Sequence, residues 1–153
     1  MNTFTKWFLL NSVFATACVL AEQRGMLSMM IKNDSSYICV LIMLLYIGIS
    51  AFLGRLSYSV DKMIDSGERK VVDKGLETGW FFAEHFFTLG LLGTLIGLCM
   101  ATQTSLNDTN SLTQMVGGMK SGLNTAFFTT IFGIVFSLPV QIQLMILKGA
   151  SEK

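Results

Sequence analysis

The chain has 153 residues, of which 52% are hydrophobic and only 14% are charged, and its formal net charge is +1. Soluble domains usually carry about 25% charged residues, so this composition is not that of an ordinary soluble protein. The small net charge gives no indication of a nucleic-acid partner, and the length suits one helical bundle.

Four apolar stretches are candidates for membrane-spanning helices. A hydrocarbon core of about 30 Å needs roughly 20 helical residues. The third and fourth stretches reach this length and the second nearly does, whereas the first needs Phe4 on one side and residues near Met26 on the other. In chain order the stretches are residues 7–21, 37–54, 80–101 and 123–147. We therefore predict an all-α integral membrane bundle with about four transmembrane helices.

The first stretch also fits a signal peptide, because Lys6 precedes an apolar run that contains Ala15-Thr16-Ala17. However, the run has only one basic residue ahead of it. We therefore expect this stretch to be retained as a membrane helix.

Lysine and arginine predict the orientation of the bundle. In a four-helix topology, both tails and segment 55–79 lie on one side of the membrane and hold eight basic residues. The loops of the other side hold three, which are Arg24, Lys32 and Lys120. Because basic residues concentrate on the cytoplasmic side, both termini and segment 55–79 are predicted to be cytoplasmic.

The two longer connections differ in character. Segment 55–79 mixes charges with apolar residues at helical intervals, so we expect it to extend the second and third helices and to turn near Ser66-Gly67. Such a charged helix pair is usually a solvated face, and a partner-binding surface is the alternative. Segment 102–122 is rich in Thr, Ser, Asn and Gln and ends in three glycines, which predicts a short polar turn.

No set of catalytic groups is recognisable. His85 is the only histidine, and neither a nucleophile–base motif nor a phosphate-binding loop is present. Cys18, Cys39 and Cys99 lie inside apolar runs without metal-ligand spacing, so we expect three buried thiols. We therefore expect a protein that is not an enzyme and that holds no metal or cofactor.

Only one acidic side chain, Glu84, lies within the apolar stretches, and His85 is next to it. Ionisable residues inside a bilayer are costly and usually mark an ion route. Both residues are close to the cytoplasmic end of the third helix. They form either an interfacial pair at headgroup depth or a cytoplasmic vestibule for ions. If protons cross this protein, the mid-membrane carboxylate must come from a partner.

Small and hydroxyl side chains recur on the last two helices. Gly93 and Gly97 are four residues apart and share one face, which permits close approach of two helix backbones. The hydroxyls either bond to their own helix and pack, or line a wet lumen and replace part of an ion's hydration shell. Pro139 is expected to kink the last helix. The candidate lumen residues are Thr94, Thr125, Thr129, Thr130 and Ser137, with Gly133 on the face of Thr130.

Two motifs in these helices resemble those of the MotA/TolQ/ExbB ion-channel family. Residues 89–97, Leu-Gly-Leu-Leu-Gly-Thr-Leu-Ile-Gly, look like the family's third-helix motif. Residues 122–139 are similar to its last-helix motif, including Thr130, Gly133 three residues on and Pro139 six beyond that. The resemblance covers residues 80–145 or so, with a polar loop between the motifs as in the family.

The resemblance implies a ring-shaped homopentamer in the bacterial inner membrane, around the membrane helices of partner chains of the MotB/TolR/ExbD type. A partner aspartate would bind and release a proton or a sodium ion, and the ion flow would drive mechanical work. By motif position, Thr94 and Thr130 would face the lumen. Residues 1–54 would then form two peripheral helices, residues 55–79 a cytoplasmic segment, and residues 80–148 the pore-lining pair.

The sequence departs from the family in three ways. Thr125 replaces a glutamate often found in the TolQ and ExbB branch, which puts a proton relay through that position in doubt. Segment 55–79 is much shorter than in the flagellar branch. The four apolar stretches differ from the three-helix TolQ and ExbB branch and fit the flagellar branch better. We therefore interpret the chain as a reduced member, with a holin-like pore former and a structural tetraspan scaffold as the alternatives.

Overall fold

The computed structural model describes residues 2–63, 69–105 and 112–151. In these ranges the chain forms five helices: α1 (Thr3–Gln23), α2 (Met26–Asn33), α3 (Ile38–Met63), α4 (Arg69–Ser105) and α5 (Leu112–Ser151). Four of them, all except α2, are long and apolar enough to cross a membrane. The prediction of an all-α protein with about four membrane-spanning helices is therefore confirmed.

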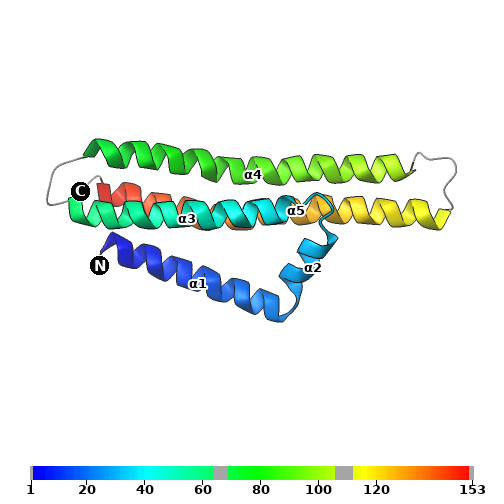
Figure 1. Ribbon diagram of the computed structural model, residues 1–153, viewed down its shortest axis with the longest axis horizontal. Coiled ribbons are helices and arrows are strands. Elements are labelled where there is room, and N and C mark those ends of the chain that lie inside the picture. The colour runs from blue at the N-terminus through cyan, green and yellow to red at the C-terminus, as the bar shows by residue number, and fades with distance from the viewer. Residues whose placement is uncertain (1, 64–68, 106–111, 152–153) are drawn as a thin grey trace.

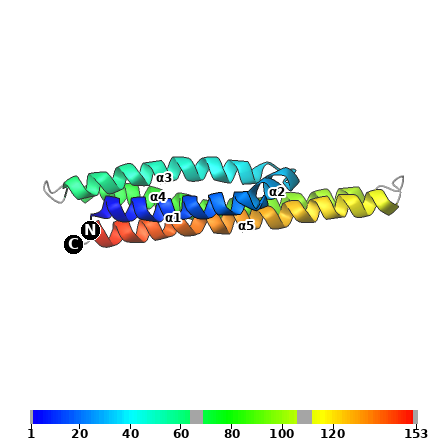
Figure 2. The ribbon, with the colours of Figure 1, turned by 90° about the horizontal axis from the view of Figure 1, so that it is seen from below.

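The helices α4 and α5 lie side by side along their whole length and form the longest part of the molecule (Figure 1). Helix α3 packs on this pair over the half that carries both chain termini, and α1 lies outside α3 and α5 (Figure 2). Both termini lie at one end of the bundle, which we call the terminal end. The opposite end consists of α4 and α5 alone, and we call it the hairpin end.

Helix α1 is the peripheral member of the bundle. Thr3 is its only buried residue, whereas the apolar core is formed by side chains of α3, α4 and α5. Leu53, Phe86, Phe132, Val140 and Leu144 are among the most deeply buried of these. Because α1 contributes so little to the core, its position must depend on a few specific contacts.

Local signals explain where the N-terminal helices begin and end. We expected the first span to need residues near Met26, but α1 ends at Gln23 because Gly25 adopts a left-handed conformation with φ of 67°. With 21 residues α1 has spanning length without this addition. The short helix α2 then returns toward the bundle and was not predicted from the sequence.

Asp34 fixes the junction between α2 and α3. Its carboxylate accepts hydrogen bonds from the backbone N–H groups of Cys39 (2.8 Å) and Ser36 (2.9 Å), which caps α3. Burial alone would raise the pKa of Asp34, but these bonds and one from the Ser36 hydroxyl outweigh it and hold the pKa below its usual range. The junction is also tied to α5, since Thr125 donates to the carbonyl of Asn33 (3.2 Å).

The predicted polar turn over residues 102–122 is wrong for most of that segment. Helix α4 continues to Ser105 and α5 already begins at Leu112. The glycines do not end the helix: Gly122 packs directly against α4, where a Cβ would lie 2.5 Å from the carbonyl oxygen of Gly97, whereas a Cβ on Gly117 would meet nothing within 4 Å. From Leu112 to Thr125 the hairpin end extends about 20 Å beyond the α2–α3 junction.

At the terminal end, α3 continues through residue 54 to Met63 and α4 begins at Arg69. Segment 55–79 thus extends the two flanking helices, as its helical pattern indicated. The expected turn at Ser66-Gly67 lies outside the described residues. At the other predicted irregularity, Pro139, α5 continues as one helix to Ser151.

Candidate functional site

The α4–α5 contact is built on glycine. A Cβ added to Gly97 would lie 2.5 Å from the carbonyl oxygen of Gly122 and 2.6 Å from the backbone nitrogen of Ala126. About two turns further toward the terminal end, a Cβ on Gly133 would lie 2.8 Å from the carbonyl oxygen of Phe86 and 3.0 Å from the Cα of Gly90. The two backbones therefore touch directly, which is how small residues join helices in a bilayer.

Thr94 and Thr130 meet across this contact. Their hydroxyl groups are within hydrogen-bonding distance of each other, and each also lies 3.0 Å from a carbonyl oxygen of its own helix, that of Gly90 for Thr94 and that of Ala126 for Thr130. Because each hydroxyl has one proton to donate, one hydroxyl donates to the other, and the acceptor of that bond donates to a carbonyl. Thr94 is additionally within 3.3 Å of the carbonyl oxygen of Ala126 on the other helix. The glycine packing brings the two hydroxyls close enough to form one polar pair.

The threonine pair is half-buried and lies at the surface of the subunit. On α4, Thr94 is in line with the exposed side chains of Leu91 and Leu98, and on α5, Thr130 is in line with those of Phe127 and Ile134. The pair is therefore a polar spot on an apolar surface formed by both helices. Its hydroxyls have acceptor capacity left for a group that approaches this surface.

The other three candidate lumen residues are enclosed within the subunit. Thr125 is fully buried against the α2–α3 junction, where it also accepts a hydrogen bond from the N–H of Ser35 (3.2 Å). Thr129 is fully buried under Gly93 and donates to the carbonyl of Thr125 (2.9 Å). Ser137 is 4% exposed and donates to the carbonyl of Ala83 on α4 (2.9 Å). The hydroxyls of Thr125 and Ser137 thus join neighbouring helices, and that of Thr129 bonds within α5.

Glu84 and His85 are both exposed on α4, about 15 Å along the helix from Thr94. The Nδ1 atom of His85 is 2.6 Å from the carbonyl oxygen of Phe81, and its ring lies 3.9 Å from the Phe81 ring. The structure does not bring these two residues together with the threonine pair. Of the three cysteines, Cys99 is exposed, so the prediction of three buried thiols is wrong at this position.

A polar cluster inside the bundle was missed by sequence reasoning. The Oδ1 atom of Asn11 on α1 accepts hydrogen bonds from Tyr46 (3.1 Å) and Ser50 (2.7 Å) of α3 and from Gln143 (3.2 Å) of α5. The available signal was the presence of amide side chains within two apolar stretches, Asn11 in residues 7–21 and Gln143 in residues 123–147, since polar groups inside a bilayer seek partners. We call these four residues the Asn11 cluster.

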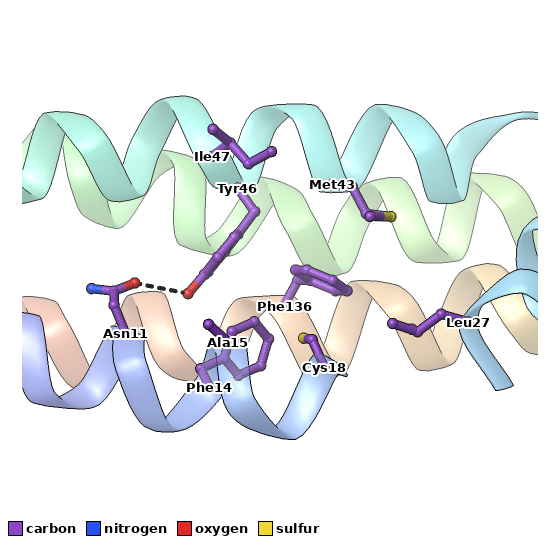
Figure 3. A pocket seen from close by; sticks show the side chains of 9 residues that line it. All are labelled: Asn11, Phe14, Ala15, Cys18, Leu27, Met43, Tyr46, Ile47 and Phe136. Atoms are coloured by element: carbon purple, nitrogen blue, oxygen red, sulfur yellow. Dashed lines mark hydrogen bonds between the residues drawn. The ribbon is translucent and has the colours of Figure 1, made fainter. Parts of the chain in front are cut away.

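Beside the Asn11 cluster lies a cavity of about 210 Å³ (Figure 3). It is bounded by α1, α2, α3 and α5 and is partly open. The rings of Phe14 of α1, Tyr46 of α3 and Phe136 of α5 pack against one another with centroids 5.1–5.4 Å apart, and Cys18 and Met43 also line the cavity (Figure 3). The hydrogen bond between Asn11 and Tyr46 closes one end of the cavity.

Four apolar helices of spanning length, joined in part by backbone contacts between glycines, define a multi-pass α-helical membrane protein. Within this class the chain belongs to the MotA/TolQ/ExbB proton channel family, whose family model matches residues 58–153, more than half of the chain. The match includes α4 and α5 with the threonine pair. Comparison with curated proteins and with solved structures gives no match.

Proposed function

We propose that this chain is the ring-forming subunit of an ion channel in the bacterial inner membrane and that Thr94 and Thr130 line its ion path. The observation that carries the proposal is the position of the pair. Both residues are half-buried at the subunit surface, on the two helices that the family model covers, and they interrupt an otherwise apolar face. A second subunit or a partner helix that packs on this face meets these two threonines among exposed apolar side chains.

The absence of acidic residues beyond Glu84 supports a requirement for a partner. Neither residues 85–105 of α4 nor residues 112–151 of α5 include an aspartate or a glutamate. A hydroxyl pair solvates a proton or a sodium ion but does not store a proton at neutral pH, whereas a carboxylate does. We therefore assign the titrating group to a single-span partner of the MotB/TolR/ExbD type. In this proposal, ion flow past the threonine pair drives mechanical work by the assembly of the chain with its partner.

The burial of three hydroxyls narrows the proposed ion path. Because Thr125, Thr129 and Ser137 are enclosed between helices of one subunit, they reach a lumen only if the subunit opens. The proposed path therefore rests on the surface pair, and Glu84 with His85 marks its vestibule on the side of the pair toward the terminal end.

The decisive experiment is ion flux through proteoliposomes that contain the chain and a candidate partner with a membrane aspartate. Replacing Thr130 by valine keeps the side-chain volume but removes one hydrogen-bonding group, which is worth about 1 kcal/mol, so we expect a roughly fivefold loss of flux. Thr130→Ser should retain most of the flux. Thr16→Val is the matched control, because the Thr16 hydroxyl is exposed on α1 and bonds only to the carbonyl of Ser12.

The same measurements separate the alternatives. A holin-like pore former would permeabilise liposomes without any partner. A tetraspan scaffold would show no flux, and Thr94→Val or Thr130→Val would then change nothing. Equal flux for Thr130→Val and Thr16→Val in the presence of the partner would overturn the proposed role of the pair.

A further inference from the structure

The cavity beside the Asn11 cluster arises from the way α1 is attached. Near the terminal end α1 is held tightly: the carboxylate of Asp61 accepts hydrogen bonds from the N–H groups of Thr3 and Phe4 (both 2.9 Å), and the Trp7 ring lies against Gly54. Toward its end at Gln23, α1 leans away from the bundle, and α2 returns to it (Figure 1). A wedge remains between α1 and the α3–α5 layer.

The wedge is lined almost entirely by apolar groups. Phe14, Met43 and Phe136 form its walls and Leu27 of α2 contributes at its wide end. Its polar atoms near Asn11 and Tyr46 are already hydrogen-bonded to each other. A cavity of about 210 Å³ would hold several waters by volume, but apolar cavities of about 150 Å³ stay dry and accept hydrocarbon instead.

The mouth of the wedge faces the bilayer. Ala15 of α1 and Ile47 of α3 line the cavity and are themselves exposed, and both belong to membrane-spanning helices. The medium at such a mouth is lipid hydrocarbon. Since close packing is the rule in protein interiors, a wedge that opens into hydrocarbon is filled by it.

We propose that this wedge binds one acyl chain of a bilayer phospholipid. The depth of the site fits one leaflet: from Arg24, an exposed cation at the α1–α2 turn, Cys18 and Phe14 lie about 9 and 15 Å along α1, and half of a hydrocarbon core is about 15 Å. Arg24 stands at the level of the headgroup phosphate. The chain end then reaches the packed rings of Phe14, Tyr46 and Phe136, which close the wedge together with the Asn11 cluster.

The test is photolabelling of the full chain in nanodiscs by a phosphatidylglycerol or phosphatidylcholine that carries a diazirine in one acyl chain. Bulk lipid labels exposed positions such as Val13, which is 63% exposed. Only a chain inside the wedge reaches Phe136 and Tyr46, which are 5% and 8% exposed. We expect mass spectrometry to find label at these two residues as well as at Val13.

Variants separate this proposal from its alternatives. Cys18→Phe fills the wedge and should abolish label at Phe136 and Tyr46 while label at Val13 persists, and Leu27→Trp should do the same from α2. Val19→Phe is the matched control, since Val19 is exposed and does not line the wedge. Label confined to Val13 in the unmodified chain would overturn the proposal, and so would persistence of the Phe136 label in both filled variants. If a helix of a second copy occupied the wedge, Phe136 would stay unlabelled and Cys18→Phe would lower the oligomer mass.

Discussion

Replacement of Gly97 by alanine should destabilise the protein far more than one methyl group suggests. The added Cβ would meet the carbonyl oxygen of Gly122 at 2.5 Å and the backbone nitrogen of Ala126 at 2.6 Å, whereas ordinary contact begins near 3.4 Å. The obstacles are backbone atoms, so no side-chain rotation relieves the overlap. The two helices must therefore move apart by about 0.9 Å at this point.

The energetic cost follows from that displacement. Overpacking of a tight interior costs about 1–3 kcal/mol, and a gap of 0.5–1 Å forfeits roughly a quarter to a half of each dispersion contact along the seam. We expect a loss of about 2 kcal/mol, which corresponds to a melting temperature roughly 4–8 °C lower for a chain of this size. Because Thr94 lies one turn away, the same movement should weaken its contact with Thr130 and reduce ion flux.

The measurement is thermal unfolding in detergent or nanodiscs, followed by intrinsic tryptophan fluorescence from Trp7 and Trp80. Gly48→Ala is the matched control, because Gly48 lies within the membrane-spanning helix α3 and a Cβ there meets no atom within 4 Å. That substitution should be neutral or stabilising by about 0.5–1 kcal/mol, since alanine favours the helix. Equal melting temperatures for the two variants would refute the reasoning.

Two further predictions concern contacts made by the N-terminal third of the chain. Asn11→Leu removes the acceptor of three interhelical hydrogen bonds, each worth about 0.6 kcal/mol, so the attachment of α1 to the bundle should weaken by about 2 kcal/mol and α1 should become sensitive to added protease. The control is Ser12→Leu, a substitution at an exposed neighbour that should leave the sensitivity to protease unchanged. Equal proteolysis of the two variants would contradict the role of the cluster. For Asp34, a folded-state pKa below the ordinary 3.8 means that its stabilisation is fully present above that value and is lost as the pH falls through the folded-state pKa. The stability difference between the unmodified chain and Asp34→Asn should therefore be constant near neutral pH and shrink below about pH 4, and a difference that stays the same down to about pH 2 would contradict it.

The sequence was sufficient to predict the helical architecture. Length and hydropathy identify four spanning helices because a bilayer admits few other structures, and the spacing of Gly93 and Gly97 indicates a close helix contact. The hairpin end was predicted as a turn because its polar residues and glycines are turn formers in isolation. Packing of Gly122 on Gly97 decides otherwise, and that packing depends on residues of another helix.

Which threonines are buried inside the subunit and which lie at its surface could not be predicted in the same way. Periodicity assigns Thr125 and Thr129 to one face of α5 and Thr130 to a neighbouring face, but it does not tell which face another element covers. The α2–α3 junction covers Thr125, and α4 covers Thr129. The Asn11 cluster was missed for a related reason, since its members come from three helices and their pairing is visible only in three dimensions.

The dependence of α1 on Asn11 has a consequence for biogenesis. Asn11 and Gln143 are separated by 132 positions, so at about 5–20 residues per second the ribosome finishes the second amide roughly 7–26 s after the first. During that interval α1 enters the bilayer, and the Asn11 amide has hydrogen-bond donors only from Tyr46 and Ser50, after these residues have left the ribosome. Helix α1 therefore completes its packing on the bundle only after α5 has been inserted, although it is the first helix to be synthesised.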